Sequence, residues 1–147
     1  MDQFKPRTIE LPVPEEVDCR FFEHEEECIL KVELSGRCSW GSRGWNYGDF
    51  LYRRVGLALL TVEPMAVLFD MEKLEYEYGD RMLRLFQLFD DIRPSGESRI
   101  LTAFVLSDSN RFGMSSLVGF DPDQPHAPFF RNEDEAYRYL FKEYDKI

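Results

Sequence analysis

The sequence predicts one α/β domain with a mostly parallel central sheet, an N-terminal antiparallel hairpin and helices as crossovers. Short continuous apolar runs, typical of buried strands, alternate with runs that repeat at helical spacing. Their order is β-β-α-β-α-β-α-β-α, and this alternation favours parallel strands joined through helices. The chain has 147 residues, 44% of them hydrophobic, which is enough for one core.

The first part of the chain predicts an arm, a hairpin and a loop. Residues 1–18 contain three prolines and little periodicity, so we expect an extended N-terminal arm before a single domain at 19–147. In residues 19–36, two apolar segments flank the acidic turn EHEEE, a pattern typical of a β-hairpin. Residues 37–49, RCSWGSRGWNYGD, are rich in glycine and aromatic side chains and predict an irregular loop.

The middle of the chain predicts two helices around a strand. Asp49 is the expected N-cap of a helix whose apolar residues recur at helical spacing. Residues 62–70, VEPMAVLFD, predict a buried strand that ends at Asp70. Asp80 is expected to cap the next helix. The apolar stripe of that helix comprises Met82, Leu85, Phe86 and Phe89.

The last part predicts two strands and two helices. Residues 99–107, RILTAFVLS, predict another buried strand, and a short helix is expected over 110–119. After the loop DPDQPHAP, the letters PFF predict a short strand. The final helix follows Asn132, and Glu135 lies three places later, which resembles a capping box.

Charge and cysteine content narrow the function classes. Eighteen Lys and Arg side chains against 28 Asp and Glu give a net charge of −10. Such a chain repels nucleic acid and anionic membranes and attracts a basic protein partner. The widely spaced Cys19, Cys28 and Cys38 favour reduced thiols and a cytoplasmic location over disulfides or a zinc site. We expect no signal peptide, no membrane span, no cofactor and no metal.

Three segments together resemble the STAS domain, the fold of anti-sigma-factor antagonists and of the cytoplasmic domains of sulfate transporters. ILKVELSG resembles the second strand of the family, and AVLFDMEKLEYEYGDRMLRLF resembles a strand, loop and second helix. LVGFDPDQPHAPFFRNEDEAYRYL resembles the C-terminal strand and helix. The resemblance covers residues 20–145 and rests on order and spacing. The crotonase fold also repeats β-β-α units, but it needs a longer chain.

The phosphorylation site of the family is the main departure. Phosphorylatable members carry Asp-Ser-Ser-Gly or a similar segment before the second helix, and here that segment falls on Tyr78-Gly79-Asp80-Arg81. The position of the acceptor serine is Gly79, so the resemblance implies no switching by a serine kinase there. Asp80 places a fixed negative charge where the phosphate would lie.

Loop aromatics beside carboxylates predict a protein-binding surface, because tyrosine and tryptophan are enriched in interface hot spots. The predicted partner-binding residues are Tyr76, Glu77, Tyr78, Asp80, Arg81, Trp40 and Trp45. We therefore expect a non-catalytic cytoplasmic protein that controls a basic partner protein by binding it. Two versions fit, a STAS-like regulator and an immunity protein that neutralises a toxin.

Two other classes remain open at this level. Some STAS domains are reported to bind nucleotides, so the glycine-rich loop at 37–49 keeps a small-ligand or nucleotide-binding function open, although G-x-G-x-x-G and a Walker A lysine are absent. A small enzyme would have to use Cys38, His24 or His126. That hypothesis predicts a pocket in which one of these side chains lies beside an acid.

Overall fold

A computed structural model describes the protein at residues 4–8, 16–38, 47–77, 79–92 and 99–145. Within these residues the helices and strands follow the predicted order. They are β1 (Val17–Glu23), β2 (Ile29–Arg37), α1 (Tyr47–Val62), β3 (Ala66–Glu75), α2 (Leu83–Ile92), β4 (Leu101–Val105), α3 (Arg111–Val118), β5 (Phe129–Phe130) and α4 (Glu133–Tyr144). Residues 4–8 adopt neither helix nor strand, and β1 begins inside the arm predicted at 1–18.

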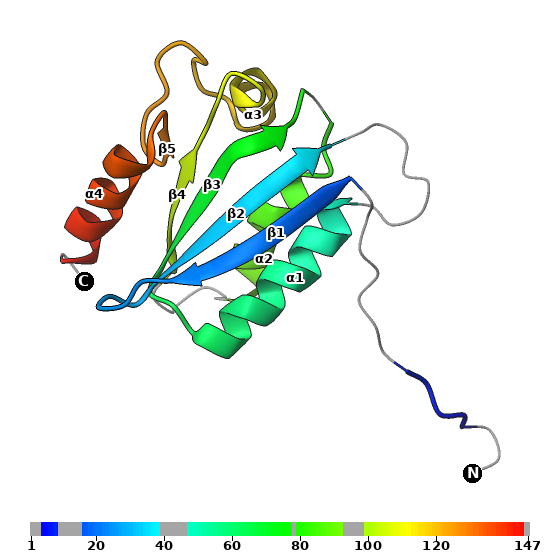
Figure 1. Cartoon of the computed structure of the whole chain (residues 1–147). Helices are drawn as coiled ribbons and strands as arrows, with labels where there is room; N and C mark the ends of the chain where they lie inside the picture. Colours follow the sequence, from blue (N-terminus) through cyan, green and yellow to red (C-terminus); the bar gives the residue numbers. More distant parts are fainter. Residues whose placement is uncertain (1–3, 9–15, 39–46, 78, 93–98, 146–147) are drawn as a thin grey trace.

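The strands of the described residues form one sheet in the spatial order β1-β2-β3-β4-β5. β1 and β2 pair antiparallel, whereas β2–β3, β3–β4 and β4–β5 are parallel. This arrangement confirms the predicted hairpin followed by parallel strands. The carboxyl ends of β2 to β5 therefore lie at one edge of the sheet, and α3 lies beyond that edge near β3 and β4 (Figure 1).

Helices cover both faces of the sheet. α1 and α2 lie side by side on one face and enclose the larger core, which contains Leu51, Phe69 and Leu85 (Figure 1). α4 lies on the opposite face, where Ala136 and Leu140 pack on a smaller apolar cluster of β3 and β4. Burial on both faces explains why the central strands are continuous apolar runs.

The strand predicted at 62–70 is wrong in both bounds. Its first residue, Val62, is the last residue of α1, and Glu63 then adopts a left-handed φ of 54°. β3 continues well past Asp70, because Met71 and Leu74 are fully buried and pairing with β2 resumes after a register shift. The exposed charged residues Glu72, Lys73 and Glu75 lie between and after these buried residues on the same strand.

One predicted helix cap is confirmed and one is wrong. The Asn132 Oδ1 accepts a hydrogen bond from the Glu135 N–H at 2.9 Å, which caps α4 as predicted. Asp49 does not cap α1, because the helix begins two residues earlier. Its carboxylate instead pairs with the Arg84 Nε of α2 at 2.9 Å and so joins the two helices on one face.

The prediction that Asp80 caps α2 is also wrong. A tight turn precedes the helix, in which the N–H groups of Leu83, Arg84 and Leu85 donate to carbonyl oxygens three residues earlier, at 3.0–3.1 Å. Asp80 begins this turn through its carbonyl oxygen. Its exposed side chain lies one turn before the helix.

Candidate functional site

Tyr76 is the buried anchor of the β3–α2 junction, which comprises residues 76–77 and 79–82. Its side chain is 1% exposed, its N–H donates to the Ser109 carbonyl at 3.0 Å, and its hydroxyl donates to the Gly79 carbonyl. Burial raises the pKa of the Tyr76 hydroxyl to about 12, so the hydroxyl stays protonated and able to donate at neutral pH. Gly79 has a φ of 117°, which a side chain would strain.

α3 holds the β3–α2 junction from the other side. Gly113 packs so closely that a Cβ there would lie 2.5 Å from the Tyr76 carbonyl oxygen. Asn110, which is 1% exposed, donates from Nδ2 to the carbonyls of Met71 at 2.5 Å and Leu74 at 2.9 Å. These contacts tie the start of α3 to the end of β3, so the junction rests on a fixed backbone.

The outer surface of the junction combines charged and apolar side chains. Glu77 and Asp80 are exposed, and Arg81 is half-buried. Leu83, at the start of α2, is 43% exposed, and Phe112, on α3, is 53% exposed. We call these five side chains the junction surface. It offers two carboxylates and two exposed apolar side chains, and α3, which carries Phe112, contacts the junction through Gly113.

The predicted partner-binding residues differ in how far the structure exposes their side chains. Glu77 and Asp80 are exposed and Arg81 is half-buried, so the prediction for these three residues stands as a prediction. Tyr76 is buried, so its side chain supports the junction and does not contact a partner, which corrects the prediction for this residue. Three further predictions lie outside the described residues, namely Tyr78, Trp40 and Trp45.

Sequence reasoning missed both apolar members of the junction surface. Phe112 falls inside a short predicted helix, and Leu83 falls beside an apolar stripe. The local pattern therefore predicts a helical position for each residue and no separate role. A helical projection of α3 carries the missing signal for Phe112, because the helix buries the next two residues, Gly113 and Met114. Phe112 is 53% exposed, and the Arg111 guanidinium lies 4.6 Å from the centre of its ring.

His24 is occupied by structural contacts. Its Nδ1 accepts hydrogen bonds from the N–H groups of Glu26 and Glu27 at 3.1 and 3.0 Å. Its Nε2 lies 3.0 Å from the Tyr137 hydroxyl, and the two rings are stacked with centroids 5.5 Å apart. The β1–β2 turn is therefore attached to α4 through this imidazole, and both ring nitrogens already have partners.

Cys38 and His24 lie too far apart to share one catalytic site. Cys38 follows β2 and His24 precedes it, so the nine residues of the strand separate them by about 30 Å. Burial raises the pKa of the Cys38 thiol to about 12, which leaves almost no thiolate at neutral pH. His126 is exposed in the loop between α3 and β5, and the structure gives its side chain no acidic hydrogen-bond partner among the described residues.

The described part of the chain contains no group of three His, Cys, Asp or Glu side chains that could hold a metal ion. Its helices are all too short or too polar to cross a membrane.

Comparison with known proteins agrees with the architecture. No protein-family model and no curated protein matches the sequence. Among solved structures, the chain is similar to an anti-sigma factor antagonist from Mycobacterium paratuberculosis, with a TM-score of 0.61 and 16% sequence identity. The similarity covers 89% of this chain and 99% of that chain. The protein therefore has the STAS fold, as the order and spacing of its segments predicted.

Proposed function

We propose that the protein is a non-catalytic regulator that controls a partner protein by binding it through the junction surface. The observation that carries this proposal is the exposure of Glu77, Asp80, Leu83 and Phe112 above a firmly anchored backbone. Protein interfaces use such aromatic and aliphatic side chains as anchors, surrounded by polar groups. The solved structure with this fold is named as an antagonist of another protein, an anti-sigma factor, which supports the proposal.

The anchored backbone matters because binding costs the entropy of ordering flexible groups. Tyr76 is bonded to the Gly79 and Ser109 carbonyls, and Gly113 leaves no room for the junction to move inward. The junction surface is thus largely ordered before a partner arrives. More of the contact energy then remains as affinity.

Charge indicates the chemistry of the partner. The chain carries a net charge of −10, and the junction surface adds two exposed carboxylates, Glu77 and Asp80. A partner with Lys or Arg side chains around an apolar patch would be attracted over a distance and would then bury Phe112 and Leu83. Nucleic acid and anionic membranes do not fit this charge.

The control works without phosphorylation of the junction. Gly79 stands where phosphorylatable STAS domains carry the acceptor serine, and Asp80 supplies a permanent charge. Binding strength would distinguish two cytoplasmic roles. An immunity protein that blocks a lethal toxin needs nanomolar affinity or tighter, about −12 kcal/mol, whereas a regulator functions with weaker binding.

The experiment that tests the proposal begins with capture of a partner from the native host by the tagged full chain. The dissociation constant is then measured with the purified partner at low and high salt. Phe112→Ala should weaken binding about tenfold or more, as expected for an interface anchor. Glu77→Gln combined with Asp80→Asn should weaken binding and reduce its salt dependence.

Matched control variants separate this surface from general effects. Leu60, on α1, is 68% exposed and lies away from the junction, so Leu60→Ala should leave affinity unchanged. Glu25, in the β1–β2 turn, is exposed, so Glu25→Gln is the control for the loss of negative charge at Glu77 and Asp80. If Phe112→Ala and Leu60→Ala affect binding equally, the junction surface is not the binding site.

A further inference from the structure

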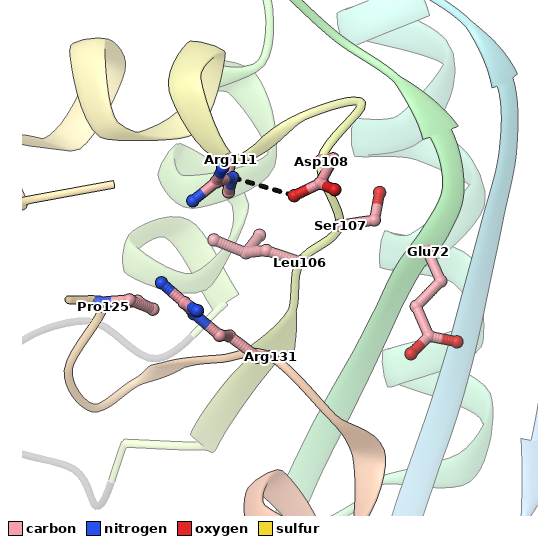
Figure 2. Close-up of a pocket in the computed structure, with 7 residues that line it drawn as sticks. All are labelled: Glu72, Leu106, Ser107, Asp108, Arg111, Pro125 and Arg131. Carbon is pink, nitrogen blue, oxygen red and sulfur yellow. Dashed lines mark ion pairs between the residues drawn. The ribbon is translucent and has the colours of Figure 1, made fainter. Parts of the chain in front are cut away.

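A cavity of about 310 Å³ opens at the carboxyl ends of the parallel strands. It adjoins the junction surface, because Arg111 lines the cavity and its guanidinium lies 4.6 Å from the centre of the Phe112 ring. Figure 2 shows that its walls come from β3, from the segment between β4 and α3, from the first residue of α3, from the loop before β5 and from the residue after β5. The residues that matter for its chemistry are Glu72, Leu106, Asp108, Arg111, Pro125 and Arg131. In open α/β sheets, small ligands bind at this edge, beyond the carboxyl ends of parallel strands. The volume is at the lower end for small-molecule sites.

One wall of the cavity carries an uncompensated positive charge. Arg131 donates from one guanidinium nitrogen to the Asp123 carbonyl, and the described residues place no carboxylate within ion-pair distance of it. Arg111 is different, because its guanidinium lies 3.0 Å from the Asp108 carboxylate and 3.3 Å from the Asp123 carboxylate. The chain has a net charge of −10, yet Arg131 lines the cavity with no described carboxylate within ion-pair distance. Its guanidinium is therefore available for an anionic group.

The opposite wall carries a negative charge without a direct counterion. Glu72 projects from β3 across the cavity from Arg131 (Figure 2). Within the described ranges, no cation forms an ion pair with its carboxylate. Partial burial, together with the carboxylates of Asp70 and Glu133, raises the pKa of Glu72, and the more distant charges of Lys31 and Lys73 offset only part of this rise. A cation placed at this wall would relieve that repulsion.

Arg111 adds a further polar group. Its Nε is buried and, within the described residues, has no hydrogen-bond partner of good geometry, although the Asp108 carboxylate is 3.0 Å away. Buried donors are normally paired, so this N–H favours a ligand acceptor or a small shift of the ion pair on binding. The Asp108 carboxylate is highly exposed and adds negative charge near the cavity entrance.

We propose that this cavity binds a small zwitterion of the free α-amino-acid class, with the ligand carboxylate on Arg131 and the ligand ammonium facing Glu72. Arg131 and Glu72 place a positive and a negative charge on opposite walls, and a ligand that carries charges of both signs can pair with each of them. Leu106 and Pro125 supply the apolar contact for a short side chain. Among the described residues, none that lines the cavity is aromatic, so these walls offer a nucleotide base no ring on which to stack.

The test is titration of the ¹⁵N-labelled full chain, followed by NMR, with the twenty L-amino acids, L-alanyl-L-alanine, acetate, inorganic phosphate and methylamine. We expect saturable shifts at Leu106 and Ser107 with one or more amino acids, and binding about tenfold weaker or worse for the singly charged probes. Arg131→Gln and Glu72→Gln should each remove this binding. Tighter binding of the dipeptide than of L-alanine would support the same charge chemistry and indicate a peptide as its source.

Two exposed residues away from the cavity serve as matched controls. The variants Arg138→Gln on α4 and Glu25→Gln in the β1–β2 turn should bind the amino acids as the parent protein does.

The proposal is overturned if phosphate or acetate binds as tightly as any amino acid and needs Arg131 but not Glu72, because the cavity is then a simple anion site. It is also overturned if no probe shifts the cavity signals. The assay contains no partner protein, so its failure leaves the proposed regulatory function untouched.

Discussion

Removal of the Asn110 side chain should destabilise the whole carboxyl edge of the sheet. Asn110 is 1% exposed and makes three bonds to backbone groups, donating to the Met71 and Leu74 carbonyls and accepting from the Ser107 N–H at 3.0 Å. Each such bond contributes roughly 1 kcal/mol net. Asn110→Ala should therefore lower the free energy of unfolding by about 3 kcal/mol.

A near-isosteric change makes the prediction more specific. In Asn110→Asp the carboxylate still accepts from Ser107, but it faces the two carbonyl oxygens of β3 with a negative charge. Those carbonyls raise the pKa of the new carboxyl above its unfolded value of about 3.9. The folded variant then binds more protons than the unfolded chain, so its stability falls as pH rises. Asn110→Asp should be at least as unstable as Asn110→Ala at pH 7 and recover partly below pH 4.

Urea unfolding followed by circular dichroism measures both variants, with linear extrapolation to zero denaturant. A loss of about 3 kcal/mol corresponds to a Tm about 6–12 °C lower for a chain of this size. Asn132→Ala is the control, because it removes one helix-cap bond at an exposed site and should cost about 1 kcal/mol. The reasoning is refuted if Asn110→Ala lies within about 0.5 kcal/mol of the parent, or if Asn132→Ala costs as much.

Four further predictions concern packing, the turn and the thiols. Gly113→Ala should cost about 1–3 kcal/mol in chemical denaturation, because the new Cβ would overlap the backbone of the junction; a neutral result would contradict the packing. Tyr137→Phe keeps the ring stacked on His24 but removes the 3.0 Å bond, so it should cost at most about 1 kcal/mol and less than Tyr137→Ala. Since burial raises the pKa of Cys38 from 9.0 to about 12, its folded thiol holds a proton that the unfolded chain loses, and stability should fall between pH 9 and 12. At pH 8, iodoacetamide should modify the exposed Cys28 much faster than Cys38, and equal rates would reject the assigned burial.

The order of elements could be predicted from the sequence because it depends on local patterns. Apolar periodicity separated strands from helices, and Asn132 capped α4 as its spacing to Glu135 indicated. Such signals involve neighbours within one turn or one strand. The same local reasoning placed Asp49 and Asp80 at helix caps, where a carboxylate is favourable but not obligatory. In the fold, Asp49 forms an ion pair with Arg84 of another helix, and a tight turn separates Asp80 from the start of α2.

The composition and local periodicity of this sequence determined an acidic α/β domain, its hairpin and its mostly parallel sheet. Only the tertiary structure decided that Tyr76 is buried while Phe112 is exposed, and that Glu72, Arg111 and Arg131 line one cavity. These residues come from separate elements, and parallel pairing brings the carboxyl ends of their strands to one edge. Burial and convergence of this kind depend on strand order and helix packing, which arise from contacts between segments far apart in the chain.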